Sequence, residues 1–293
     1  MRTSILLFVL VLVVSCGKRN RSGDSEVFLE ARPLGQLTDE KLEEVSGLAA
    51  SKANPGYLWT HNDSGNPPEV YLVDEELKIR LSCRLPGIKN RDWEDIAVGP
   101  GPADNKTYVY VADIGDNNAR YTVKYIYRFE EPLLNGTDGE LTIGKFDRIS
   151  FRLADGKKDT EAIMIDPKTK NIYVVSKREK PVSIYRINYP YSVDTTVTAE
   201  KVFSLPLTQI VSADISPDGN ELLMKNYDNI FYWQINGQPL QEVFQRKPQL
   251  LKYTAEPQGE AIAFNLDGSG FYTLSETIVS EKIFLYYYER KKR

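Results

Sequence analysis

Apolar residues fall into short runs along this chain, and clusters of turn-forming residues separate the runs. Pairs of such runs recur roughly every 50 residues. The first run of a pair carries small and branched residues, and the second is rich in aromatic and branched ones. Turn formers such as Pro217-Asp218-Gly219 lie between them. The pattern predicts five β-hairpins, at residues 45–49 and 57–63, 93–97 and 108–113, 160–164 and 172–177, 211–215 and 222–226, and 259–263 and 271–276.

A third and a fourth run extend most of these hairpins. The third runs are residues 69–73, 123–129, 182–187, 230–235 and 282–288, and the fourth are 79–85, 148–153, 201–205 and 249–253. The last repeat has no fourth run, and residues 26–31 are expected to pair beside residues 283–288 and close a ring. Four strands per repeat predict an all-β, five-bladed β-propeller. Six blades are the alternative, because the long second repeat could contain a degenerate hairpin.

The first residues follow a different pattern. Residues 5–14 form an unbroken apolar run after Arg2, and as a helix they would rise only about 15 Å, half a bilayer. Val13-Val14-Ser15-Cys16 resembles a lipobox, in which the cysteine receives diacylglycerol. We therefore expect a lipoprotein signal peptide at residues 1–15, a tether at 16–25 with lipidated Cys16, and a single propeller domain at 26–293. The alternative is an ordinary secretory signal with a chance cysteine.

This leader predicts an exported protein whose lipid anchors it to the cell-envelope membrane; periplasmic and surface exposure stay open. The charge and the cysteine content further narrow the classes of partner and of covalent cross-link that this chain could have. The chain has 37 Lys and Arg, 41 Asp and Glu, and no basic block, so nucleic acid is not an expected partner. With Cys16 lipidated, Cys83 has no disulfide partner, and its alternating surroundings indicate a small core residue.

The first strand of each propeller blade lines the central channel, so one position per repeat is expected to form a ring. Three carboxylates in a narrow channel must be protonated, paired or bound to a cation. Oxygen side chains suit Ca²⁺, whereas zinc would need His or Cys. A solvated acidic funnel without an ion is the alternative. The candidate metal ligands are Ser46, Glu94, Glu161, Ser212 and Glu260, with Asp214 replacing Ser212 in the other possible register.

The turns after each second strand are expected on the same face as this ring. Each turn alone is weak evidence, because Asn, Asp and Gly favour turns, but five such loops on one face predict a ligand or catalytic site. The candidate catalytic residues are His61, Asp63, Asp113 and Asp116. The candidate ligand-binding residues are Asn62, Asn117, Lys177, Arg178, Lys225, Tyr227 and Glu276.

Two resemblances follow from these motifs. The phrases at residues 92–100, 110–117 and 211–219 resemble a widespread family of exported bacterial propellers without an assigned activity. The ring is similar in type and order to the calcium ring of five-bladed calcium-activated nucleotidases (apyrases), and more loosely to phytase-like and lactonase-type calcium propellers. The loop from Asn62 and the pair Lys177-Arg178 occupy places where apyrases carry acidic and basic residues. The residues His61-Asn62-Asp63 and the loop at 113–118 have no clear counterpart there, so the likeness implies calcium more than nucleotide hydrolysis.

Two functions stay open. One is a Ca²⁺-dependent hydrolase of phosphoester, phosphoanhydride or lactone substrates, binding a small anionic ligand. The other is a non-catalytic propeller that binds a glycan, peptide or protein on its loop face. The sequence has no Gly-x-Ser-x-Gly elbow, no Cys–His pair and no Gly-rich phosphate loop, so it leaves open whether the protein is an enzyme.

Overall fold

The computed structural model describes residues 27–136, 138–278 and 281–292. The predicted signal peptide, Cys16 and the tether lie outside the described residues, as does Glu26, the first residue of the predicted closing strand. Within the described ranges, no helix is long and apolar enough to cross a membrane.

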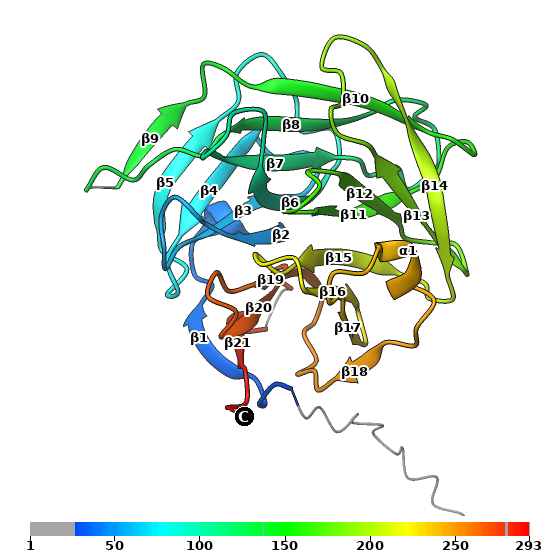
Figure 1. The fold of residues 1–293 in the computed structure, drawn as a ribbon. Helices are drawn as coiled ribbons and strands as arrows, with labels where there is room; N and C mark the ends of the chain where they lie inside the picture. Colours follow the sequence, from blue (N-terminus) through cyan, green and yellow to red (C-terminus); the bar gives the residue numbers. More distant parts are fainter. Residues whose placement is uncertain (1–26, 137, 279–280, 293) are drawn as a thin grey trace, which may run out of the picture.

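The chain folds as a β-propeller, and the regular secondary structure of its described residues is almost entirely β-strand (Figure 1). Its strands form five antiparallel groups of four, which we interpret as blades 1 to 5. Blade 1 consists of β2 (Val45–Ala50), β3 (Leu58–Asn62), β4 (Glu69–Val73) and β5 (Ile79–Arg84). Blade 2 consists of β6 (Trp93–Pro100), β7 (Thr107–Asp113), β8 (Lys124–Glu130) and β10 (Asp147–Leu153). Blade 3 consists of β11 (Thr160–Ile165), β12 (Ile172–Ser176), β13 (Val182–Ile187) and β14 (Val197–Leu205). Blade 4 consists of β15 (Ile210–Ile215), β16 (Glu221–Asn226), β17 (Ile230–Gln234) and β18 (Gln249–Leu251). Blade 5 is β19 (Gly259–Phe264), β20 (Gly270–Ser275), β21 (Phe284–Glu289) and β1 (Arg32–Gln36).

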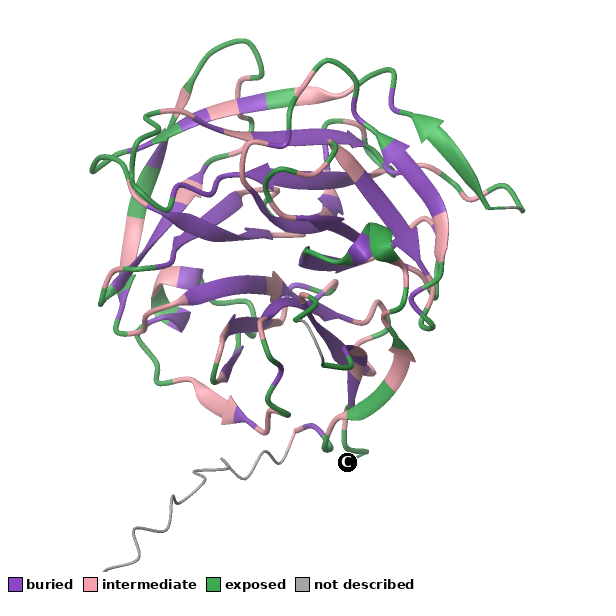
Figure 2. Ribbon diagram, turned by 180° about the vertical axis from the view of Figure 1, so that it is seen from behind, coloured by how far each residue is buried: buried purple, intermediate pink, exposed green. Residues whose placement is uncertain are grey.

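The innermost strands β2, β6, β11, β15 and β19 contact one another in a closed ring. Apolar side chains from neighbouring blades fill the space between each pair of blades. Figure 2 shows this as buried inner strands with exposed outer loops. Cys83 is fully buried between blades 1 and 2, as predicted for a small core residue, and burial raises the pKa of its thiol.

An N-terminal strand closes the ring, but not the predicted segment. The outer strand of blade 5 is β1, which pairs antiparallel with β21. Within the predicted segment, Phe28 forms an isolated bridge with Arg290. The Phe28 ring packs edge-on against Phe271 and Tyr232, so this stretch fills the core between blades 4 and 5 and the strand begins after it. Pro33 is tolerated because β1 lies at the edge of its sheet.

Two parallel strand pairs were not expected from the sequence. The long second repeat contains β9 (Gly139–Thr142), which pairs in parallel with β5 at the outer edge of blade 1. The outer strands β10 and β14 also pair in parallel, and this joins blades 2 and 3 into one eight-stranded sheet. The extra length of the second repeat therefore supplies an edge strand for its neighbour.

One buried carboxylate joins blades 1 and 2. Glu131 follows β8 and is 6% exposed. The hydrogen bonds that its two oxygens accept come from Ser51 Oγ (2.6 Å), Lys52 N (3.0 Å), Trp59 Nε1 (2.9 Å), Ala53 N (3.0 Å) and Thr107 Oγ1 (2.6 Å). Because these donors come from both blades, the side chain fixes how the two blades meet.

Candidate functional site

Every inner strand begins with a register shift against its neighbour in the blade. Such a bulge leaves a residue unpaired in the ladder and re-aims its side chain. The unpaired residues are Glu94 in β6, Glu161 in β11, Val211 in β15 and Glu260 in β19, while in β2 the shift spans Ser46 and Gly47. The bulges therefore place three carboxylates at equivalent positions of the inner ring.

The predicted ring position in blade 4 was wrong. Val211, not Ser212, is the unpaired residue of β15, because Ser212 pairs with Lys225 in the ladder. The Ser212 Oγ instead lies 3.2 Å from Oδ1 of Asp95 and donates a hydrogen bond to it. The other candidate, Asp214, lies farther along β15 and lines a small cavity together with Lys52 and Pro100. A one-residue change of register decides which side chain joins the ring.

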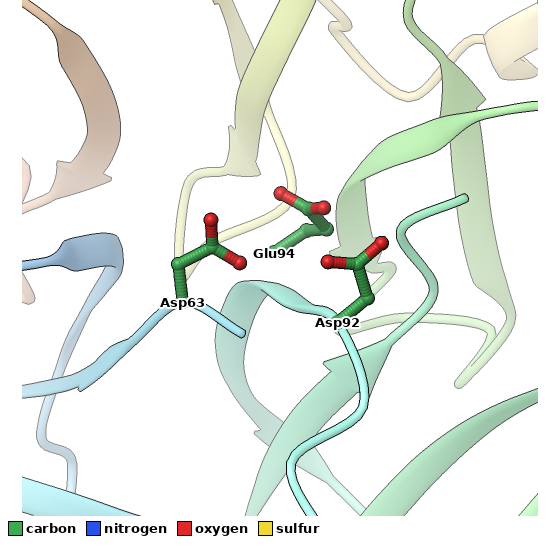
Figure 3. Close-up of side chains that lie close together, drawn as sticks. All are labelled: Asp63, Asp92 and Glu94. Carbon is green, nitrogen blue, oxygen red and sulfur yellow. The ribbon is translucent and has the colours of Figure 1, made fainter. Parts of the chain in front are cut away.

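Three carboxylates lie close together (Figure 3) near the end of the ring where the inner strands β6, β11 and β19 begin, which we call the mouth of the channel. Asp63 follows β3, Asp92 precedes β6, and Glu94 is the bulge residue of β6. One carboxylate oxygen of each lies within 4.8 Å of the others. Asp92 was not among the predicted ligands, although its place two residues before Glu94, at the start of a predicted strand, was a usable signal. We call Asp63, Asp92 and Glu94 the carboxylate cluster.

The backbone at Gly115 closes one side of the carboxylate cluster. A Cβ at this position would overlap Oε1 of Glu94 and the carboxylate of Asp92. The Gly115 N–H donates to the main-chain oxygen of Asp92 at 3.0 Å, which holds the two segments together. The sequence Asp113-Ile114-Gly115-Asp116 therefore contains glycine where the carboxylates need room.

Burial and like charge raise the pKa values of the carboxyl groups at the mouth. Burial raises the pKa of Asp63 to about 6, and it raises that of Glu94 well above its usual value, with Glu161 adding to the effect. The Glu94 and Glu161 carboxyl groups are in hydrogen-bonding contact, and burial raises the pKa of Glu161 to about 7. Burial and Glu260 raise the pKa of Glu276 to about 9. The mouth thus contains more carboxyl groups than can be ionised together without a cation.

Lys177 partly compensates this charge. Its Nζ lies 2.9 Å from Glu161 and 3.9 Å from Glu260, and 5.5 Å from the centre of the Tyr227 ring. The Tyr227 hydroxyl donates to Glu260, and Ser46 Oγ donates to the main-chain oxygen of Glu94 at 2.9 Å. Among the predicted metal ligands, Glu94 belongs to the carboxylate cluster, whereas Glu161 and Glu260 share a lysine beside it.

Three of the four predicted catalytic residues stabilise the surrounding loops. His61 is fully buried with Nδ1 3.0 Å from the Asn62 oxygen, and burial lowers its pKa to about 4. Asp113 accepts from the Asp92 N–H at 3.0 Å and from the Tyr127 hydroxyl at 3.3 Å, and burial raises its pKa to about 6. Asp116 accepts from the N–H groups of residues 120 and 121 at 2.6 and 2.7 Å. Asp63 is the one that joins the carboxylate cluster.

Most predicted ligand-binding residues already have protein partners. Arg178 donates to Asp159 at 2.6 Å and to Asn117. Asn62 donates to the Lys41 oxygen at 2.7 Å, and Glu276 accepts from Gln258 at 2.5 Å. Lys225 is fully buried, donates to the Gly259 oxygen and lies 3.6 Å from Glu256. These contacts leave few uncompensated positive charges for an anionic ligand in this part of the described chain.

Replacing Asp214 with Asn is expected to flatten the pH dependence of stability. Burial raises the pKa of Asp214 to about 7, so the folded state favours the protonated form. The stability that the protonated Asp214 contributes is fully present below the pKa of this group in the unfolded chain, near 4, and is lost as the pH rises toward 7. Each pKa unit corresponds to about 1.4 kcal/mol, so a loss on the order of 2–4 kcal/mol is expected between these limits.

Denaturant unfolding of the parent and Asp214→Asn across this pH range checks the prediction. The Asn oxygen can still accept from the Phe264 N–H, which now bonds Asp214 Oδ2 at 2.8 Å. The variant should therefore fold, and its free energy of unfolding should not show the part of the decline with pH that Asp214 causes. Equal slopes for the two proteins would contradict a raised pKa at Asp214.

Comparisons with known proteins assign neither a family nor a function to this chain. No protein-family model matches the chain, and no curated protein matches its sequence. Among solved structures, the chain is similar to the WD40 repeats of RRP9, with a TM-score of 0.40 and 11% identity over 84% of this chain and 67% of that chain. The propeller assignment therefore rests on the strand pairing described above, and no function is transferred from that protein.

Proposed function

We propose that this chain is an exported, lipid-anchored propeller that binds Ca²⁺ at the mouth of its channel and uses the ion to hold an anionic ligand. The supporting observation is the carboxylate cluster, in which oxygens of Asp63, Asp92 and Glu94 lie within 4.8 Å of one another beside Gly115. The lipobox-like sequence ending at Cys16 supports the anchor.

The chemistry of the cluster suits a hard cation. All three side chains offer oxygen, which Ca²⁺ prefers, and the cluster contains no His or Cys, which zinc would need. Glu94 is 4% exposed, and its carboxyl contacts another carboxyl, that of Glu161. A divalent cation at this position would neutralise charge that Lys177 leaves uncompensated.

Ligand binding is favoured over catalysis by the positions of the predicted catalytic groups. His61, Asp113 and Asp116 are buried and hydrogen-bonded within the protein, and Asp63 is itself a proposed ligand of the ion. A bound Ca²⁺ would attract and polarise a phosphoryl or carbonyl group. Hydrolysis of a phosphoester, phosphoanhydride or lactone is the second candidate, supported by the exposed loop residues Ser64 and Gly65 that give access to Asp63.

Calorimetric titration of the purified protein with Ca²⁺ tests the proposal. One Ca²⁺ per chain is expected, with weaker Mg²⁺ binding because Mg²⁺ demands stricter geometry. Glu94→Gln should abolish the binding heat, and Glu130→Gln, which changes an exposed glutamate, should keep it. Absence of Ca²⁺ binding by the parent would refute the proposal. Ca²⁺-dependent release of product from phosphoesters or lactones would make hydrolysis the leading function.

A further inference from the structure

A cavity of about 580 Å³ lies between blades 4 and 5, a volume typical of small-molecule sites. It is lined by the turn after β16, by β18 and the segment that follows it, by residues 30–31, and by Tyr288 of β21. Figure 1 labels β18 and β21 in the lower half of the ring. Asp63, Asp92 and Glu94 do not line it, so it is distinct from the carboxylate cluster.

Three tyrosines line this cavity, and each hydroxyl is fixed by the protein. Tyr227 donates to Glu260, Tyr253 donates to Glu256 at 2.7 Å, and Tyr288 accepts from the Thr254 N–H at 3.1 Å. Rings held in this way lose little conformational freedom when a ligand packs on them. Tyr227 and Tyr253 therefore present preorganised aromatic surface, whereas the Tyr288 ring is buried and stacked on Phe271.

The two tyrosine rings with neighbouring lysines offer little attraction to a cationic ligand. The Lys225 Nζ lies 4.6 Å from the centre of the Tyr253 ring, and the Lys177 Nζ lies 5.5 Å from that of Tyr227. An aromatic ring attracts a cation through the negative potential of its faces. An ammonium group already beside each ring reduces the attraction for a second cation.

The same walls disfavour an anionic ligand. The carboxylates of Glu30 and Asp228 line the cavity. Lys252, the lysine among the lining residues, is paired with Glu30 at 3.0 Å. A negatively charged group would meet two carboxylates and a lysine that is already neutralised, so the cavity disfavours an anionic ligand.

We propose that this cavity binds a neutral saccharide. The carbon–hydrogen faces of a sugar ring pack against aromatic rings, and its hydroxyls bond to the carboxylate of Asp228, the amide of Asn229 and the hydroxyl of Thr254, all of which line the cavity. This site goes beyond the proposed Ca²⁺ function and requires no ion.

Saturation-transfer NMR and calorimetry on the whole protein test the proposal, with neutral trisaccharides of glucose, galactose, mannose and N-acetylglucosamine as probes. At least one should bind, with a Kd of about 1 mM or below. Choline and inorganic phosphate should not compete. Asp228→Ala and Tyr227→Ala should weaken binding tenfold or more, whereas Tyr227→Phe retains the ring and should bind nearly normally. Gln238→Ala, beside another cavity, is the matched control.

Melting curves verify that the variants fold, and Asp228 is exposed, so its replacement leaves the core intact. Failure of every trisaccharide at about 10 mM, or preferential binding of choline or phosphate, would overturn the saccharide proposal. The EDTA-treated protein should bind the sugar as well as the untreated one. If the parent binds sugar but not Ca²⁺, the proposed Ca²⁺ function is refuted and the saccharide proposal stands. If sugar binding disappears with EDTA, the claim that this site needs no ion is refuted.

Discussion

Protein stripped of divalent cations is expected to melt several degrees higher once Ca²⁺ is added. A ligand that binds only the folded state adds about 2.7 kcal/mol at 100 times its Kd. For a domain of this size, that corresponds to roughly 5–10 °C in melting temperature. The physical reason is the carboxylate cluster, where oxygens of Asp63, Asp92 and Glu94 lie within 4.8 Å of one another and burial raises the pKa of each carboxyl group.

Relative to the parent, variants of the carboxylate cluster should be more stable without a divalent cation and less stable with Ca²⁺. Glu94→Gln removes a buried carboxyl whose pKa is raised by burial and by Glu161, so the cation-free variant should melt higher than the cation-free parent. The same variant should gain nothing from Ca²⁺. Asp92→Asn should behave alike, because burial and Asp159 raise the pKa of Asp92.

Asp214→Asn is the control for this experiment, because Asp214 lines a separate cavity together with Lys52 and Pro100. Its Ca²⁺ response should equal that of the parent even where its stability differs. A Ca²⁺ response that survives in Glu94→Gln would place the ion elsewhere. Loss of the response in Asp214→Asn as well would indicate a general effect of charge rather than a site.

Replacement of Glu131 by Ala is expected to destabilise the protein by about 4 kcal/mol, or roughly 10 °C in melting temperature. The change removes the acceptor of the buried donors Trp59 Nε1 and Ser51 Oγ, and of the partly buried Thr107 Oγ1 and two main-chain N–H groups. Buried donors without partners cost far more than a lost surface contact. Denaturant unfolding at neutral pH measures the difference.

The neighbouring glutamate supplies a matched control. Glu130 pairs with Lys106 at 2.6 Å, but both side chains are about half exposed. Such a pair contributes little, so Glu130→Ala should change stability by less than about 1 kcal/mol. Glu131→Gln retains one acceptor oxygen and should fall between the two alanine variants. Similar losses for Glu130→Ala and Glu131→Ala would show that the hydrogen bonds of Glu131 do not join the blades as described.

The strand pattern was predictable because each strand carries its own local signal. The alternation of apolar runs and turn residues located the hairpins within a few residues, as in β11 and β12. The closing strand was displaced from its predicted place because Phe28 is apolar for core packing between blades, not for strand pairing. Strand propensity alone does not distinguish an apolar residue that packs between blades from one that pairs within a strand.

The site was less predictable because it depends on register and on tertiary contacts. The bulge that puts Val211 in the ring leaves no mark in the residue pattern, since Ser212 looks equally suitable. Asp92 joins the carboxylate cluster through the approach of the loop after β3, and Glu131 finds its donors about 80 residues away in sequence. Contacts of this kind arise only when the blades assemble.

The closure of blade 5 has a consequence for the order of folding. Its outer strand β1 precedes blade 1 along the chain, and its partner β21 follows blade 4. Blades 1 to 4 can form from strands that are near one another in sequence, but the ring closes only through this pairing between distant segments, which is slow to form. Until the pairing forms, β1 and β21 each have an unpaired edge that another chain could capture, so the open ring is the state of this fold most exposed to misassembly.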